Sequence, residues 1–202
     1  MEKKFIAAWN AFCEYYQGKR RLEETLKQKL QSNLVGPYFR EEADLVFHFA
    51  RFLLDVFGDG MVHLNSPITK FYFSNYTGKK AYVDIDISDP KIFMTKNVSR
   101  QIFAEFKWIW RGIKKARSTY FTDIMANIEK DLEKLKCLKN LGICQKAFMC
   151  IVDEEPQLSQ IQNKKQCWEK KYSVKVLLCT YTDVGCSCLN RLNDTLLFHP
   201  CQ

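Results

Sequence analysis

Apolar residues recur with a helical period at the start of the chain. Residues 1–34 are predicted to be helical with a break at Gly18, and Gly36 and Pro37 end the segment. Leucine also returns at every fourth position, at Leu22, Leu26, Leu30 and Leu34. We interpret this stripe as a packing face rather than a dimer zipper, and a homodimer is the alternative.

A second helix is predicted from Phe39 to Phe57, because one side of a 3.6-residue period is apolar there. The run Gly58–Gly60 is predicted to stop this helix. The residues that share the apolar side are Leu45, Val46, Phe49, Leu53 and Val56.

Short runs rich in β-forming residues follow the second helix. MVHL, ITKFYF and KKAYVDIDIS are separated by Asn, Ser, Pro or Gly, which predicts consecutive strands. The first two can also form one strand bent around Pro67. RQIFAEFKWIW, at residues 100–110, is expected to be a further strand.

Helices and strands then alternate. A long helix is predicted from Ser118 or Thr119 to about Leu141, with Gly142 behind its end. KAFMCIV is expected to be a buried strand, followed by a helix near residues 158–170 and the strand VKVLLCTY. The order predicts an α/β fold with a mixed central β-sheet flanked by helices. The side of the long helix that is expected to face the core carries Ile124, Ile128, Leu132 and Leu135.

Composition fits one domain with an extension. The chain has 202 residues, of which 47% are hydrophobic, enough apolar material for a core without disulfides. Lysine and arginine outnumber aspartate and glutamate by 31 to 23, and the net charge of +8 favours anionic partners such as nucleic acid. No run approaches the roughly 18–20 apolar residues that span a bilayer, so a membrane partner is not expected.

Cysteine usage indicates a reducing compartment. The chain has nine cysteines, an odd number, and no export signal precedes them, which predicts reduced thiols in a cytoplasmic protein. A zinc site is the alternative, but the densest group lacks paired C-x2-C spacing. That group consists of Cys179, Cys186, Cys188, His199 and Cys201.

Two strands carry an acidic and a lysine-bearing face. Side chains alternate along a strand, so in VDIDI the residues Val83, Ile85 and Ile87 share one face and Asp84 and Asp86 share the other. In the strand at residues 100–110 the same rule places Glu105 and Lys107 together, beside the apolar Phe103 and Ile109.

Pairing of these strands would create a metal site. Opposed side chains on neighbouring strands come within about 5 Å, so an aspartate would reach the pair formed by Glu105 and Lys107. Mg²⁺ or Mn²⁺ accepts two carboxylates, a main-chain carbonyl such as that of Phe106, and a substrate phosphate. Lys107 could position or activate the attacking water, or offset charge in the transition state.

An aspartate in one strand followed by E-x-K in the next resembles the PD-(D/E)XK nuclease superfamily. The similarity covers residues from about 40 to 152, where the order of helix, three strands, helix and strand (α-β-β-β-α-β) matches the restriction-endonuclease-like core. It implies an N-terminal helical extension at residues 1–36 and a nuclease-like domain at residues 37–202.

The resemblance also implies roles for individual residues. Asp84 and Glu105 would bind the metal and Lys107 would be catalytic, with Asp86 as a further candidate ligand. Glu42 matches a glutamate that many members carry on the first core helix, and it lies on an otherwise apolar helical face. A carboxylate directed at a sheet requires a metal or another partner, unless it remains partly solvated in the first turn.

Basic residues directly follow the motif strand. The predicted contacts to a phosphate backbone are Arg111, Lys114, Lys115 and Arg117. Trp108 and Trp110 share a strand face with Phe106 and are expected to pack in the core. Three further lysines are interpreted as the solvated face of their helix, namely Lys130, Lys134 and Lys136.

The function predicted from these patterns is metal-dependent hydrolysis of phosphodiester bonds in nucleic acid, with DNA favoured. A restriction-like module that binds nucleic acid or protein without cutting is the main alternative. An enzyme acting on a small phosphorylated molecule is the third, and against it the chain has no glycine-rich phosphate loop of the G-x-x-x-x-G-K-S/T kind.

Overall fold

A mixed β-sheet forms the centre of the protein. The computed structural model describes residues 1–30, 39, 41–68, 81–88, 100–110, 120–154 and 159–180. The strands in this part of the chain lie in chain order, with β1–β2 and β2–β3 antiparallel and β3–β4 and β4–β5 parallel. They are β1 (Val62–Ile68), β2 (Ala81–Ile87), β3 (Arg100–Ile109), β4 (Cys144–Asp153) and β5 (Lys175–Thr180).

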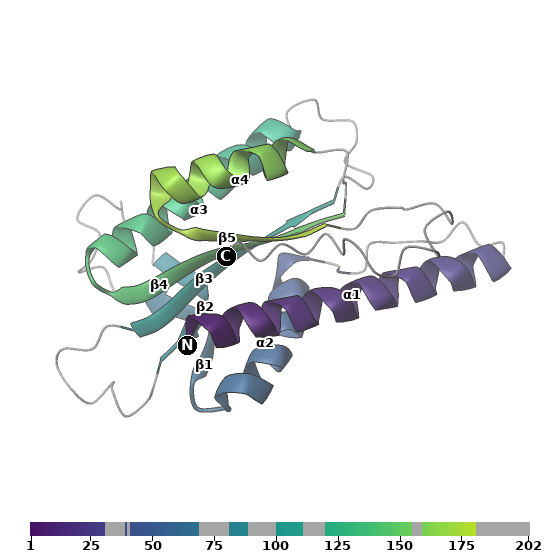
Figure 1. Cartoon of the computed structure of the whole chain (residues 1–202), viewed down its shortest axis with the longest axis horizontal. Coiled ribbons are helices and arrows are strands. Elements are labelled where there is room, and N and C mark those ends of the chain that lie inside the picture. The colour runs from purple at the N-terminus through teal and green to yellow at the C-terminus, as the bar shows by residue number, and fades with distance from the viewer. Residues whose placement is uncertain are drawn as a thin grey trace.

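Helices cover both faces of the sheet (Figure 1). α1 (Glu2–Leu30) and α2 (Glu42–Phe57) pack on one face. α3 (Tyr120–Asn140) and α4 (Ser159–Tyr172) pack on the other and provide the crossovers that the parallel strands require. The prediction of an α/β protein with a mixed sheet flanked by helices is therefore confirmed.

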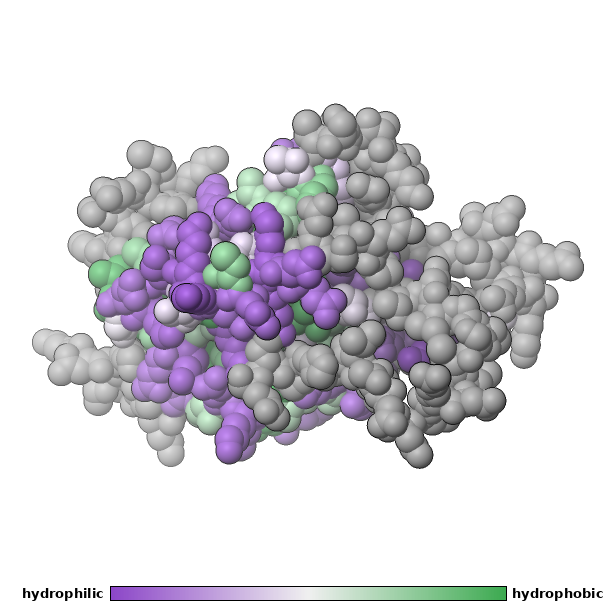
Figure 2. All heavy atoms as spheres, turned by 45° about the horizontal axis from the view of Figure 1, so that its top comes forward, coloured by the Kyte–Doolittle hydropathy of each residue, from purple (hydrophilic) through white to green (hydrophobic). Residues whose placement is uncertain are grey.

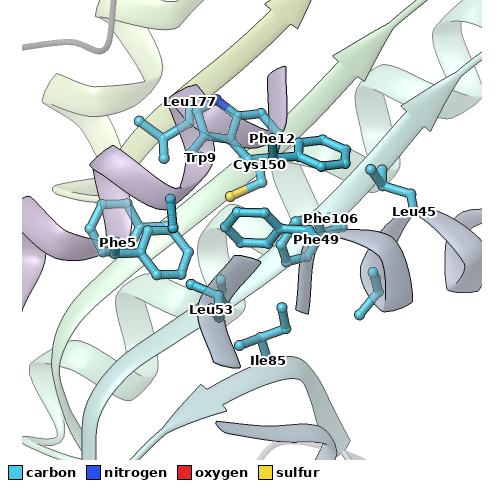
Figure 3. Close-up of a cluster of buried hydrophobic side chains, with 14 of the residues drawn as sticks. Phe5, Trp9, Phe12, Leu45, Phe49, Leu53, Ile85, Phe106, Cys150 and Leu177 are labelled. Atoms are coloured by element: carbon cyan, nitrogen blue, oxygen red, sulfur yellow. The ribbon is translucent and has the colours of Figure 1, made fainter. Parts of the chain in front are cut away.

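Aromatic side chains fill the space between α1, α2 and the sheet. In Figure 3, Trp9 of α1 and Phe49 of α2 lie near Phe106 of β3, and Phe5 of α1 lies to the side of Phe49. The Phe5 and Phe49 rings meet edge to face at 5.5 Å, and Phe49 lies 5.4 Å from Phe106. α1, expected as an extension, thus contributes to the same hydrophobic core as α2 and the strands.

α1 continues through Gly18, so the predicted helix break there is wrong. Glycine costs a helix about 1 kcal/mol relative to alanine. The part of the helix before Gly18 buries large apolar side chains, which outweighs that cost. The buried side chains of α1 that precede Gly18 are Phe5, Trp9, Phe12, Cys13 and Tyr16.

The predicted boundaries of α2 and β1 need small corrections. α2 begins at Glu42, three residues later than expected, and Phe39 is fully buried ahead of it. Gly58 ends the helix as predicted, with a φ of 85° and its N–H donating to the Leu54 carbonyl. Pro67 lies inside β1, so MVHL and the start of ITKFYF belong to one strand.

α3 and α4 cover a second hydrophobic core, on the opposite face of the sheet from α1 and α2. α3 buries Ile128, Leu132 and Leu135 as predicted, whereas Ile124 is only partly buried. The outer side of these helices faces the viewer in Figure 2, and its coloured surface is mainly hydrophilic. Within the described residues, no helix is long and apolar enough to cross a membrane.

The alternation predicted for VDIDI fails at one residue. Ile85 and Ile87 pack in the core beneath α1 and α2, but Val83 packs in the core beneath α3 and α4. The ladder between β1 and β2 skips the pair that Asn65 and Asp84 would form, and Asn65 has a φ of 49°. This local distortion turns the strand between Val83 and Ile85, at the position of Asp84.

Candidate active site

The candidate site lies where β2 and β3 separate. Their ladder, as far as the structure describes the two strands, has three pairs and ends at Ile85–Ala104. From Glu105 onward β3 pairs only with β4 in the described ladders. The Asp84 carboxylate replaces the missing strand partner, since its Oδ2 accepts a hydrogen bond of 2.8 Å from the Phe106 N–H. This bond fixes Asp84 at the open edge of β3.

Glu105 points toward α3 and is almost fully buried. Its Oε1 lies 2.6 Å from the Lys134 ammonium. Burial, followed by the negative charge of Asp84, raises the pKa of Glu105 to about 8, although Lys134 opposes the shift. Burial also raises the pKa of Asp84, against the hydrogen bond from Phe106. Both carboxyl groups are therefore destabilised as anions.

Lys107 lies between two further carboxylates. Its ammonium is 3.0 Å from Glu42 Oε1 and 3.0 Å from Asp131 Oδ2, and it donates to the Phe106 carbonyl at 3.0 Å. Burial alone would lower the pKa of Lys107, but Glu42 and Asp131 outweigh it and hold the pKa well above the usual range. Lys107 therefore carries a positive charge at neutral pH.

Glu42 reaches the site from the first turn of α2. Its Oε2 accepts a hydrogen bond of 3.4 Å from the Trp108 N–H, while Oε1 contacts Lys107. Burial raises the pKa of Glu42, and the Lys107 ammonium opposes that rise. The helix thus supplies a carboxylate to the open edge of β3, on the side predicted from its periodicity.

Two residues of α3 belong to the site and were not predicted. Asp131 contacts Lys107, and Lys134 joins Glu105 and donates to the Tyr82 carbonyl at 3.0 Å. The interpretation of Lys134 as a solvated lysine is wrong, because its side chain is only 11% exposed. Its spacing from Asp131, at i and i+3 next to the buried Leu135, was the available signal.

The two aspartates of VDIDI occupy different surroundings. Asp86 is fully buried, lies opposite Phe103 in the ladder, and accepts a hydrogen bond from Ser66 Oγ at 3.1 Å. Burial raises the pKa of Asp84, and the charge of Lys107 is close enough to oppose that rise. The Phe106 carbonyl, a predicted metal ligand, is the group that accepts from Lys107.

The described residues of this site carry more acidic than basic groups. Four carboxyl groups lie with two ammonium groups, so ionisation of all four would give a formal excess of two negative charges in a largely buried region. The raised pKa of Glu105 keeps that group mainly protonated at neutral pH while no cation is bound. A divalent cation would offset this excess, and carboxylate oxygens suit Mg²⁺ or Mn²⁺. The carboxylates are Asp84, Glu105, Glu42 and Asp131, and the ammonium groups are Lys107 and Lys134.

The geometry limits the number of protein ligands. Among the described residues, no group of three or more His, Cys, Asp or Glu side chains is arranged to hold a metal ion. Mg²⁺ is usually bound through one or two carboxylates plus substrate phosphates and water, and does not need a complete protein cage. Asp84 and Glu105 fit that smaller set.

A pocket of about 370 Å³ adjoins the site. Glu42, Lys107 and Asp131 form part of its lining, together with side chains from the first half of α3. The predicted phosphate contacts Arg111, Lys114, Lys115 and Arg117 fall outside the described residues, as do Cys186, Cys188, His199 and Cys201. Cys179 is a buried free thiol in β5.

Of the two tryptophans after Lys107, Trp108 packs against the core as expected, whereas Trp110 is only partly buried and stacks on Trp108. The Trp108 and Trp110 rings stack at 5.6 Å and 4°, and Trp108 is partly buried against the core beneath α1 and α2. Trp108 Nε1 donates to Glu154 Oε1 at 3.1 Å, and Arg20 of α1 contacts the other oxygen of Glu154 at 3.4 Å. α1 therefore holds the end of β3 next to Glu42.

Comparison with protein-family models, with curated proteins and with solved structures finds no match for the chain.

Proposed function

We propose that the protein is a metal-dependent nuclease of the PD-(D/E)XK type, which hydrolyses phosphodiester bonds in nucleic acid, with DNA favoured. The observation that carries the proposal is that Asp84, Glu105 and Lys107 lie together at the open edge of β3. Glu42 forms an ion pair with the same lysine. Glu42, Asp84 and the pair formed by Glu105 and Lys107 lie far apart in sequence. Their meeting in a site where acidic groups outnumber basic groups among the described residues supports a function for the motif.

Asp84 and Glu105 would hold the cation. Asp84 is preferred to Asp86, because the hydrogen bond from Phe106 directs it to the edge that Lys107 occupies. When bound, the cation would polarise the scissile phosphate and lower the pKa of an attacking water. The attacking water would release a proton to solvent as its oxygen bonds to phosphorus, the bond to the leaving oxygen would break, and the leaving oxygen would take up a proton from another water molecule.

Lys107 acts in this proposal as a fixed positive charge. Glu42 and Asp131 keep its pKa high, so it is a poor proton acceptor at neutral pH. Its ammonium can instead hold the attacking water and stabilise charge that develops on the phosphate oxygens. Glu42 and Asp131 position that ammonium from two helices.

A module that binds nucleic acid or protein without cutting is the second candidate. The observation in its favour is that both lysines already contact carboxylates, with Lys134 only 2.6 Å from Glu105. Such a network can serve stability or binding alone. Binding to nucleic acid without cleavage in any divalent metal would establish this candidate instead of the nuclease.

The proposed activity is tested on a supercoiled plasmid and on a single-stranded substrate, each incubated with Mg²⁺, Mn²⁺ or a chelator. We expect cleavage with metal and none with the chelator. Asp84→Ala should abolish cleavage, because it removes one of two carboxylates that hold the cation. Circular dichroism checks that the variant is folded. Metal-dependent cutting that survives this substitution would point to a different site or a contaminant.

Lys134→Ala is expected to lower the Mg²⁺ concentration for half-maximal cleavage by roughly tenfold, or about 1.4 kcal/mol. The Lys134 ammonium lies 2.6 Å from Glu105 and competes with a cation for that carboxylate. A metal titration of the cleavage rate measures the change. The control is Lys170→Ala, an exposed lysine of α4. A higher metal requirement in Lys134→Ala would show that Lys134 supports metal binding.

A further inference from the structure

One wall of the pocket beside the candidate site is formed by α3. The pocket extends from Glu42 and Lys107 along the first half of α3. Its volume of about 370 Å³ lies near the lower end of the roughly 300–1,000 Å³ typical of small-ligand pockets. A group that enters this pocket would lie directly next to a phosphate bound at Lys107.

The wall is a stripe of α3 that borders its core face, and Ile124 belongs to both because it also packs against the core beneath α3 and α4. Tyr120, Ile124, Asn127 and Asp131 follow one another at intervals of four, three and four residues, so they share one side of the helix. The buried residues of α3 are Met125, Ile128, Leu132, Leu135 and Leu138. The pocket stripe ends at Asp131, which contacts Lys107.

The chemistry of this stripe suits a nucleobase. Tyr120 offers a flat ring, held in place because its hydroxyl donates to the Trp110 carbonyl at 2.6 Å. Ile124 adds apolar surface, and the exposed Asn127 amide offers both a donor and an acceptor to a base edge. Lys130, also exposed on the lining, can contact a phosphate. Stacking on such a wall tolerates any base, because every base has a π-face.

We propose that this pocket receives one unpaired nucleobase beside the phosphate to be cut, so that the substrates are single strands or unpaired ends. The proposal rests on the nuclease function and names its substrate class. Bases of an intact duplex remain stacked inside it and would have to be flipped out to enter. A single strand presents them without that cost.

The test compares binding of three labelled probes by fluorescence anisotropy in chelator, where cutting is absent. The probes are a 12-nucleotide DNA strand, its duplex, and a strand of equal length without bases. We expect the natural strand to bind at least tenfold more tightly than the other two, or about 1.4 kcal/mol. Equal binding of the natural and base-free strands would overturn the pocket proposal.

Asn127→Trp fills the pocket from an exposed helical position, and it should bring the natural strand down to the affinity of the base-free strand. Ala126→Trp adds the same bulk at an exposed position outside the pocket lining and should retain the preference. Asn127→Ala, a smaller change, should give a partial loss and covers the case in which the tryptophan variant does not fold. Unchanged binding in a folded Asn127→Trp variant, or in Asn127→Ala where only that variant folds, would overturn the proposal.

Cleavage assays separate this proposal from the nuclease function. Base-dependent binding that Asn127→Trp removes, without cleavage in Mg²⁺ or Mn²⁺, would leave the pocket in place and refute the nuclease. Cleavage of strands and duplexes at equal rates, unaffected by Asn127→Trp, would leave the nuclease in place and refute the pocket.

Discussion

Lys107→Ala is expected to lower kcat/KM for nucleic-acid cleavage by about 10³-fold, the scale of losing one fixed charge or proton-transfer group at a reacting centre. The ammonium lies between Glu42 and Asp131 and stays charged at neutral pH. In the proposed mechanism, its removal takes away the positive charge that would face the scissile phosphate. Initial rates over a range of substrate concentrations measure the effect.

Two controls distinguish a lost charge from a lost fold. Lys107→Arg restores a positive charge on a planar group that differs from an ammonium in shape, so partial recovery is expected. Circular dichroism and urea unfolding show whether each variant retains its structure. Cleavage by a folded Lys107→Ala within tenfold of the wild-type rate would mean that the lysine only balances the charges of Glu42 and Asp131.

The fold could largely be predicted because hydrophobic periodicity reports burial. The apolar side of α2 and the buried strand β4 follow directly from such patterns. Gly18 was misread because a local penalty of about 1 kcal/mol is small beside the burial of Trp9 and Tyr16 on the same helix. The turn of β2 at Asp84 depends on Asn65 in the neighbouring strand, so no pattern within VDIDI could reveal it.

The site was only half predictable, for a related reason. Glu105 and Lys107 stand two residues apart, so alternation alone places them on one face of a strand. Asp131 and Lys134 enter the site from α3 through tertiary packing, and their charges make them look like solvent-facing residues in sequence. A charged pair on a helix is expected to be buried only where it lies next to the apolar stripe that faces the core.

Glu105→Gln is expected to stabilise the protein above pH 8 by on the order of 2 kcal/mol in the absence of divalent metal. The pKa of Glu105 is about 8 in the folded chain, against an ordinary value of 4.5. The folded state therefore holds this proton more tightly than the unfolded state does. The stability that the protonated group contributes is complete below about pH 4.5 and is lost as the pH rises to about 8.

Urea unfolding at pH 5 and at pH 8.5 measures this difference. From pH 5 to pH 8.5 the free energy of unfolding of the wild type should decrease more than that of Glu105→Gln. The Gln amide has no proton to lose, and its oxygen still accepts a hydrogen bond from Lys134. Asp55→Asn removes an exposed carboxylate of α2 and should follow the wild type. A Glu105→Gln variant that is less stable than the wild type at pH 8.5 would mean that the pair with Lys134 outweighs burial and the repulsion from Asp84.

The same variant tests metal binding without any activity assay. At pH 8.5 a cation that binds the folded wild type should stabilise it, by about 2.7 kcal/mol when its concentration is a hundred times Kd. Glu105→Gln should lose most of this gain, because one of the two proposed charged ligands is gone. The comparison is made with Mg²⁺ or Mn²⁺ against KCl of equal ionic strength. Equal stabilisation of both proteins would place the cation elsewhere and remove Glu105 from the proposed metal site.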